Sequence, residues 1–420
     1  MTMMSVIKTF VMMSGERYCL LVNAHSGLPF FYPNLFITTQ SRNRSLSYSS
    51  MESTLSGISV LLRFMQKRGE NIETRFQKGE FFKGYELDAL RDFCQIKFRS
   101  QRTKEESNGI LNISGLRDFD EKVSSQTEYV RLTVIAQYTK WLAEQQFVGS
   151  SKDRLIVLQI GKMEKGLKAR RPVKKNRNAV RDEKGLDEEQ IALVFELFRP
   201  DSELNPFTDK SVRIRNRLIF LMLYHLGLRG GELLNIRIRD IDFGKNQLVV
   251  VRRADEKDDP RTNQPLVKTL DRRLPMKDTL VQEIHHYILN GRKNIPNSNK
   301  NDFLFVTHKS GPTQGQPLSK SGYKKVIEIV RTASPALFNF TGHQLRHSWN
   351  EAFSNQMDAM NESPNQEQQE KMRSYLMGWK EGSGTATHYN KRFVRKKANE
   401  AALKLQEGMV RVPVGVTNGK

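Results

Sequence analysis

The chain of 420 residues is poor in cysteine, in acidic residues and in long apolar runs. Its two cysteines, Cys19 and Cys94, are too few and too far apart for a disulfide framework or a zinc site, and they fit a reducing cytoplasm. Its most apolar run, residues 218–228, contains His225 and falls short of the ~18 apolar residues that a membrane-spanning helix needs. These absences argue against a disulfide-stabilised secreted protein and against a membrane protein, and they predict a cytoplasmic one.

The chain carries a large excess of positive charge. It has 68 lysines and arginines against 46 aspartates and glutamates, which gives a formal net charge of +22. With 38% hydrophobic and 27% charged residues it has the composition of a soluble globular protein, and its length allows two or three domains. A charge of this size attracts a polyanion such as nucleic acid or an anionic membrane surface, although a well-solvated surface explains it equally well.

Residues 1–49 form a distinct N-terminal segment in the sequence. Residues 17–22, 30–32 and 35–39 are short runs of β-favouring residues, and turn-forming residues separate the first two runs. The segment is interpreted either as a disordered leader or as a small arm that contacts DNA or a neighbouring subunit. The two interpretations have equal weight at this point.

Residues 50–161 are predicted to form a small helical bundle with a basic surface. Apolar residues recur there at helical spacing, as Leu55, Ile58 and Leu62 do at its start. Such stripes are typical of a helix that buries one face in a core. The bundle is therefore expected to have its own core and to precede the second domain of the chain.

Residues 162–185 are strongly basic and are predicted to be a linker. Its basic side chains include Lys168, Arg170, Arg171, Lys174, Lys175 and Arg177. A run of charge is usually only solvated, but this run lies between two predicted domains of a basic protein. We therefore expect these side chains to lie along a phosphate backbone.

A second domain is predicted over residues 186–408, followed by a tail at 409–420. Asp187 and Gln190 have the spacing of a helix capping box, and Gly227 ends a later buried helix. Strands are expected at 236–243, 248–252, 265–275 and 303–306, with a helix near 278–290. The fold class of this domain is therefore α+β, mostly helical, with a small sheet at one edge.

The first motif with chemical content surrounds Arg229. This arginine follows a predicted helix stop in the run His-Leu-Gly-Leu-Arg-Gly-Gly-Glu and begins the next helix. A guanidinium beside helix N-terminal amides suits a phosphate group. Glu232, three residues on, is placed to orient a neighbouring cationic group. An arginine after a helix stop is common, so the motif by itself is weak.

The second motif is His-Gln-Leu-Arg-His, which places His343, Arg346 and His347 on one helix. His343 and Arg346 are one helical turn apart and are predicted to reach the same phosphate. His343 and His347 also have the spacing of a zinc-protease motif, but Gln344 stands where such enzymes need a glutamate. No metal site is therefore predicted. A buried histidine beside a surface arginine would explain the motif if it stood alone.

Three more residues complete a set of groups for phosphoryl transfer. Lys268 lies in the predicted strand 265–275, ahead of the Arg-Arg-Leu-Pro run that ends at Pro275, with Lys257 as the alternative lysine in the same region. Trp379 follows a glycine, and Tyr389 lies ten residues later, before a basic segment. Arginines bind phosphate oxygens, a lysine or histidine moves protons, and a tyrosine hydroxyl can form a covalent intermediate. These are the groups that metal-free attack on a DNA phosphate requires.

The order and context of these motifs resemble the phage-integrase family, also called the tyrosine recombinases. Residues 225–236 are similar to the first box of that family, and residues 343–347 are similar to its second box, His-x-x-Arg. The motifs span residues 186–400, whereas residues 50–165 match only in general layout. The stretch between the second box and the tyrosine is longer than is usual in the family, with a polar insertion at residues 358–370.

The resemblance implies a helical SAM-like core-binding domain followed by a tyrosine-recombinase catalytic domain. It implies that Tyr389 attacks a DNA phosphate and forms a 3′-phosphotyrosyl bond, with no metal or other cofactor. The other catalytic residues that it implies are Arg229, Lys268, His343, Arg346 and Trp379, with Glu232 and His347 supporting them.

The resemblance further implies a site-specific recombinase that acts on double-stranded DNA target sites as a homotetramer, with accessory DNA-bending proteins as further partners. The size of the chain and its N-terminal segment favour an integrase of a mobile genetic element, located in the cytoplasm at the nucleoid. A topoisomerase or a hairpin telomere resolvase would share every catalytic residue. The alternative of a different class is a non-catalytic, sequence-specific DNA-binding regulator.

Overall fold

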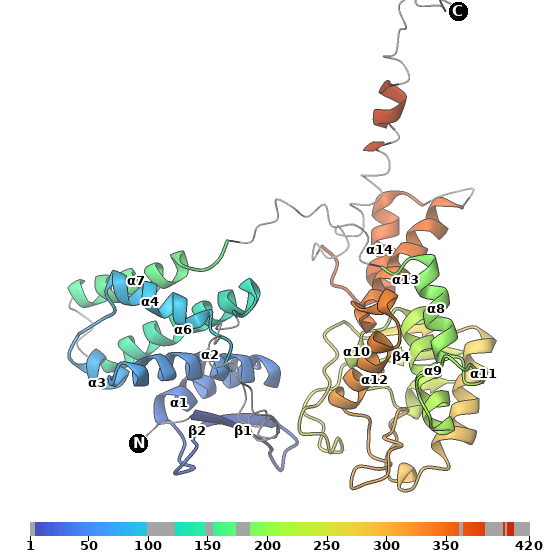
Figure 1. Cartoon of the computed structure of the whole chain (residues 1–420), viewed down its shortest axis with the longest axis horizontal. Coiled ribbons are helices and arrows are strands. Elements are labelled where there is room, and N and C mark those ends of the chain that lie inside the picture. The colour runs from blue at the N-terminus through green and yellow to red at the C-terminus, as the bar shows by residue number, and fades with distance from the viewer. Residues whose placement is uncertain are drawn as a thin grey trace, which may run out of the picture. The chain divides into compact units, whose positions relative to one another are not determined.

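The computed structural model contains two compact units, which are shown in Figure 1. It describes residues 5–98, 122–147, 154–173, 185–360, 364–382, 398–399 and 401–406. The first unit is built mainly on the described residues up to 173, and the second on those from 185 onward. Within these ranges, no helix is both long enough and apolar enough to cross a membrane.

The first unit begins with a β-hairpin and continues with helices. Strands β1 (Ser5–Val11) and β2 (Arg17–Asn23) are antiparallel, with Ser5 opposite Asn23 and Val11 opposite Arg17. The helices that follow are α1 (Phe31–Gln40), α2 (Tyr48–Lys67), α3 (Ile72–Gln77), α4 (Gly84–Cys94), α6 (Ser125–Gln146) and α7 (Arg154–Ala169).

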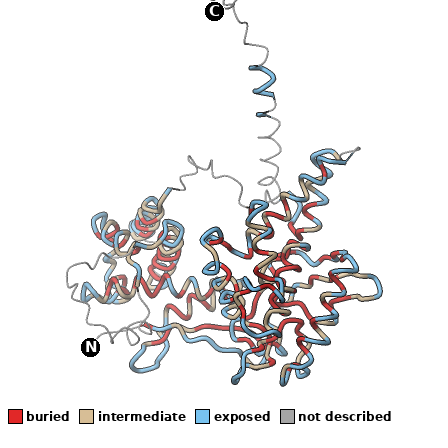
Figure 2. The backbone as a smooth tube through the Cα atoms, turned by 45° about the vertical axis from the view of Figure 1, so that its right-hand side comes forward, coloured by how far each residue is buried: buried red, intermediate tan, exposed pale blue. Residues whose placement is uncertain are grey.

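The hairpin and the helices share one hydrophobic core. Leu21 of β2, Ile37 of α1, Leu55 of α2 and Leu132 of α6 are all fully buried in the same cluster. Figure 2 shows such buried stretches in red within each unit. The boundary expected between residues 49 and 50 therefore falls inside a continuous unit.

Two of the three expected β-like runs are wrong, because residues 30–32 and 35–39 contribute to helix α1 instead. β-Branched and aromatic residues favour strands, but here Phe36 and Ile37 are buried in the core of the unit. The hydroxyl of Thr38 also donates to the carbonyl of Asn34 (2.9 Å), so the threonine supports the helical backbone.

Helix α7 takes up the beginning of the basic segment that was expected to be a linker. It runs through Arg154–Ala169 and buries Ile160, Met163 and Leu167 against the core of the first unit. An apolar stripe at this spacing is typical of an amphipathic helix, so residues 162–169 belong to the first unit.

The second unit is mostly helical, with one small antiparallel sheet in the order β3-β4-β5. The strands are β3 (Ile241–Asp242), β4 (Gln247–Val250) and β5 (Arg272–Pro275). The helices are α8 (Glu188–Phe198), α9 (Lys210–Leu226), α10 (Gly230–Leu233), α11 (Asp278–His286), the π-helix η4 (Tyr287–Arg292), α12 (Lys320–Ala333), α13 (Gly342–Asp358) and α14 (Gln366–Met377).

The expected class of the second unit is confirmed, and several of its details are as predicted. Asp187 and Gln190 form the capping box of α8, and α9 ends at Gly227. The strands are shorter than expected, and residues 303–306 make only isolated bridges, so the strand predicted there is wrong. Helix α9 is the centre of this unit, because it packs against α8, α11 and α13.

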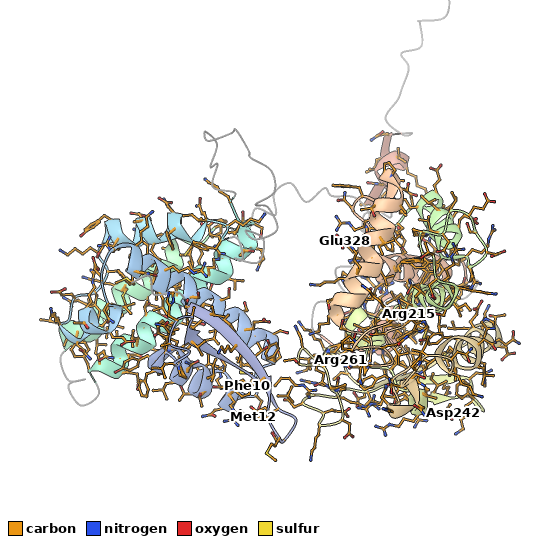
Figure 3. All side chains as sticks on the ribbon, turned by 60° about the horizontal axis from the view of Figure 1, so that its bottom comes forward. Phe10, Met12, Arg215, Asp242, Arg261 and Glu328 are labelled. Carbon is orange, nitrogen blue, oxygen red and sulfur yellow. The ribbon has the colours of Figure 1, made fainter. Side chains whose placement is uncertain are left out.

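A buried arginine anchors the long connection between β4 and β5, which spans residues 251–271. Arg261, labelled in Figure 3, lies inside the second unit. Its Nη1 donates to the carbonyls of Leu234 (2.9 Å) and Leu318 (3.0 Å), and its Nη2 donates to Asp259 Oδ2 (2.7 Å). Arg261 therefore fixes the connection to the rest of the second unit.

Candidate active site

Arg229 is positioned by a glycine turn between α9 and α10. Gly227 adopts a left-handed conformation (φ 60°) and ends α9. A Cβ at this position would lie 2.8 Å from Met377 Cε and 3.0 Å from Trp349 Cγ, so only glycine fits without a shift. The chain then turns at once into α10, with Arg229 as its N-cap. The Arg229 side chain is 29% exposed and is open to a ligand.

Glu232 of α10 is a buried carboxylate at the centre of several donors. It accepts from Thr269 Oγ1 (2.6 Å), Arg272 Nη2 (2.8 Å) and the backbone N–H of Arg229 (3.1 Å). The Nη1 atoms of Arg229 and Arg346 lie 3.4 Å and 3.8 Å from its carboxylate oxygens.

The protonation state of Glu232 follows from these neighbours. Burial alone would raise the pKa of Glu232, but the guanidiniums of Arg272 and Arg346, together with the hydrogen bonds it accepts, hold its pKa below the ordinary value. The group is therefore a fixed negative charge that partly neutralises a cluster of arginines.

Arg346, from α13, is fully buried in this structure. Its Nη1 donates to the carbonyl of Gly227 (2.7 Å) and its Nη2 donates to the carbonyl of Met377 (2.8 Å). The ring of Trp379 lies 5.5 Å from its guanidinium carbon, in cation–π contact. Arg346 thus connects the end of α9 to the end of α14. Met377 and Trp379 are among the residues that bury its guanidinium.

His343 and His347 share the first two turns of α13 with Arg346. His343 is exposed and His347 is half-buried, and their ring centroids are 4.6 Å apart. Thr341 and Gln344 form the capping box that begins the helix. No group of three or more potential metal-ligating side chains occurs among the residues that the structure describes.

Lys268 lies on the connection between β4 and β5, with its side chain exposed. Its neighbour Thr269 is buried and donates to Glu232, so the backbone at Lys268 is held beside α10. Lys257, the alternative lysine, is exposed earlier on the same connection. The structure therefore brings Thr269, the neighbour of Lys268, to the same carboxylate as Arg229 and Arg346.

Trp379 follows the left-handed glycine that ends α14. Gly378 has a φ of 63°, and its carbonyl accepts from the backbone N–H of Leu270 (2.9 Å). The Trp379 side chain is buried against Met377 and Trp349. Tyr389 lies outside the described residues, so its role as the nucleophile stays a prediction.

The structure adds two functional candidates that the sequence patterns did not indicate, namely Thr269 and Arg272. Arg272 is the arginine of the Arg-Arg-Leu-Pro run that ends at residue 275, and the Glu232 carboxylate lies 2.8 Å from it. The Arg-Arg-Leu-Pro run was the signal available in the sequence. The contact between Arg272 and Glu232 joins residues 40 positions apart, and the periodicity of the sequence does not predict such a contact.

The basic segment is only partly covered by the structure. Lys168 pairs with Glu164 (2.6 Å), and Arg170 pairs with Asp88 (2.7 Å). Arg171 lies over the ring of Tyr129 at 4.8 Å. These three residues fasten the end of α7 within the first unit. Lys174, Lys175 and Arg177 lie outside the described residues.

Comparison with known proteins supports the relationship that the motifs indicated. Residues 201–394 match the phage integrase family. Residues 201–394 therefore form an integrase domain of this family, the tyrosine recombinases. The tyrosine recombinase XerA of Pyrococcus horikoshii is 30% identical over 150 residues, which is 36% of this chain and 44% of that protein. Transposase A from transposon Tn554 of Staphylococcus aureus is 28% identical over 148 residues, which is 35% of this chain and 38% of that protein.

The chain spans less than half the length of the curated relatives that it matches. Among solved structures, the Tn1549 transposon integrase in complex with transposon right end DNA is 16% identical, with a TM-score of 0.47. That comparison covers 89% of this chain and all of the other.

Proposed function

We propose that this protein is a site-specific DNA recombinase that cuts and rejoins DNA through a 3′-phosphotyrosyl intermediate. The observation that carries the proposal is the buried carboxylate of Glu232, which has Arg229 and Arg346 within 3.4 Å and 3.8 Å. Two arginines from separate motifs thus meet at one place, as binding of a single phosphate requires. The family of the integrase domain supports the same chemistry.

In the proposed reaction Tyr389 attacks a scissile phosphate. Its oxygen forms a bond to phosphorus while the bond to the 5′-oxygen breaks, which leaves a 3′-phosphotyrosine and a free 5′-hydroxyl. His343 accepts the tyrosine proton and Lys268 donates a proton to the leaving 5′-oxygen. Attack by the 5′-hydroxyl of a second DNA reverses the step without ATP, because the phosphodiester energy is kept in the phosphotyrosine.

The two arginines stabilise the charge that develops on the non-bridging oxygens. Arg229 is open to the phosphate, whereas Arg346 is covered by Met377 and Trp379. Because the Arg346 side chain is fully buried, a phosphate reaches it only if Met377 or Trp379 shifts. Trp379 would then shape the pocket or donate to the phosphate from its indole.

The wider setting is proposed from the family and from the arrangement of the chain. The first unit serves as a core-binding domain that grips double-stranded DNA, and the basic segment from Lys168 to Arg177 follows the phosphate backbone. Four copies assemble on two duplexes, with accessory DNA-bending proteins where a target site needs them. The similarity to transposase A of Tn554 supports an origin in a mobile genetic element.

The first experiment is covalent capture of the substrate. Cells that express the tagged protein are lysed in strong detergent, and DNA that remains attached to the protein is sequenced. We expect attached DNA focused on one or a few sequences for the wild type, and none for Tyr389→Phe. Normal DNA binding with no covalent DNA in either sample would instead favour a non-catalytic DNA-binding regulator.

A further inference from the structure

The residues next to Lys268 on its C-terminal side are fastened to two other elements of the integrase domain. The Thr269 hydroxyl donates to Glu232 Oε1 (2.6 Å), which ties the connection to α10. The Leu270 backbone N–H donates to the Gly378 carbonyl (2.9 Å), which ties it to the end of α14. On the other side of Lys268, Val267 is buried in the hydrophobic core. The position of the Lys268 backbone is therefore set from both sides.

The guanidinium of Arg272 forms hydrogen bonds with all three of these parts of the domain. Its Nη2 donates to Glu232 Oε2 (2.8 Å), its Nη1 donates to the Thr269 hydroxyl (3.1 Å), and its Nε donates to the Leu376 carbonyl (2.7 Å). One planar fork thus connects α10, the Lys268 connection and α14. A lysine ammonium at this position has no fork with which to make the three contacts.

There is little space in which this junction can shift. A Cβ at Gly378 would lie 2.8 Å from Arg272 Nη1, 2.9 Å from the Leu270 carbonyl oxygen and 2.9 Å from Thr269 Cβ. The Arg272 side chain is 1% exposed, so it cannot contact DNA itself. Its influence on a reaction has to pass through the groups that it holds.

We propose that Arg272 and Thr269 are positioning residues that hold Lys268 at the scissile phosphate. The inference rests on the proposed function, in which Lys268 protonates the leaving 5′-oxygen. Glu232 pairs with Arg229 and accepts hydrogen bonds from both Thr269 and Arg272. The phosphate-binding arginine and the loop that carries the proton donor are therefore held by the same carboxylate. Loss of the Arg272 or Thr269 contact moves the proton donor, while Glu232 keeps its own contacts with Arg229.

The test compares two leaving groups on the DNA sequence recovered by covalent capture. One substrate carries the ordinary 5′-oxygen at the scissile phosphate, and the other carries a bridging 5′-sulfur. A thiolate leaves without a proton from an acid, because a thiol is far more acidic than an alcohol. The sulfur substrate therefore removes the need for Lys268 and reports on everything else in the site.

We expect Arg272→Lys to form the covalent complex ~100-fold more slowly than the wild type on the oxygen substrate, the size of a general-acid contribution. On the sulfur substrate its rate should return to within a few-fold of the wild type, as it should for Lys268→Ala. Arg273→Lys is the matched control, because Arg273 is the next residue of β5 and is exposed. It should match the wild type on both substrates.

A merely structural role for Arg272 predicts a different pattern. Equal slowing of Arg272→Lys on both substrates, or no slowing on either, would overturn the inference. If Arg272→Lys does not fold, Thr269→Val removes only the hydroxyl, and it should show the same rescue by sulfur. Thr269→Ser should keep more activity than Thr269→Val on the oxygen substrate. Failure of the wild type to attach to either substrate would instead refute the proposed function itself.

Discussion

Glu232 decides the electrostatics of this site at the scale of one residue. Its carboxylate is fully buried, yet it stays charged because Arg272 and Arg346 outweigh the effect of burial on its pKa. A buried charge that loses its partner is costly, typically by about 3–5 kcal/mol, whereas an exposed ion pair contributes about 1 kcal/mol or less. The buried guanidiniums of Arg272 and Arg346 thus depend on this carboxylate to compensate their positive charge.

We predict that Glu232→Gln lowers the free energy of unfolding by about 3 kcal/mol, because it leaves Arg272 and Arg346 uncompensated. Chemical denaturation of the purified proteins would measure the loss. Glu283→Gln is the control, since Glu283 forms a 2.8 Å pair with Arg217 in which both side chains are more than a quarter exposed. A loss of 1 kcal/mol or less is expected for that variant.

The same carboxylate predicts a pH dependence. The pKa of folded Glu232 lies below its ordinary value of 4.5. Its contribution to stability is therefore fully present above that value and is lost as the pH falls through the lowered pKa of the folded state. The stability difference between the wild type and Glu232→Gln should shrink below about pH 4.5. A difference that stays constant down to the acid unfolding transition would contradict this account.

At the scale of elements, the site is a meeting point of helix ends. Helix α9 ends at Gly227, α14 ends at Gly378, and both glycines are left-handed. The carbonyls of Gly227 and Met377 converge on Arg346, while that of Leu376 accepts from Arg272. Cations near helix C-termini are favourable because the last carbonyls have no helical partner. The helix ends thus hold Arg346 and Arg272 through backbone carbonyls, which at a helix C-terminus have no hydrogen-bond partner within the helix.

We predict that Gly227→Ala destabilises the integrase domain by more than Gly382→Ala does. Both glycines have a positive φ, 60° and 70°, so both alanines are strained by about 1 kcal/mol. The Cβ added at Gly227 also collides with Met377 and Trp349, whereas no contact within 4 Å is made at Gly382 by the residues that the structure describes. Equal shifts of the melting temperature for the two variants would show that the close contact has no effect.

At the scale of the whole molecule, the net charge of +22 favours association with a polyanion, as the proposed action on DNA requires. Each phosphate that a protein neutralises releases counterions, and the affinity then falls with salt with a log–log slope of about 0.9 per contact. The basic segment between the two units adds charge where the chain passes from one unit to the other.

We predict that changing Lys174, Lys175 and Arg177 to glutamine lowers this salt slope by roughly 2–3, as the loss of three phosphate contacts requires. Fluorescence anisotropy on the captured DNA at increasing potassium chloride would give the slope. The control removes the same charge from three exposed lysines of the integrase domain, Lys293, Lys300 and Lys309. Equal losses for both triple variants would mean that the segment is only a solvated charge.

Two helix-end signals in the sequence are confirmed by the structure. The capping box at Asp187 and the stop at Gly227 depend only on residues within a few positions, and both appear where the pattern predicts them. Residues 35–39 were misread as strand because the burial of Phe36 and Ile37 among distant helices overrides a local strand preference. The single core that joins the hairpin to the helices was missed for the same reason.

The sequence by itself determined which chemical groups this protein carries and in what order. The sequence carries an arginine after a helix stop, a histidine and an arginine one turn apart, a lysine and a tyrosine, and these residues point to the family without any coordinates. Only the tertiary structure decided that Glu232 is the shared anchor, that Arg272 fastens three elements to it, and that Arg346 is covered. Those facts depend on contacts between residues far apart in the chain, and such contacts exist only once the helices have packed.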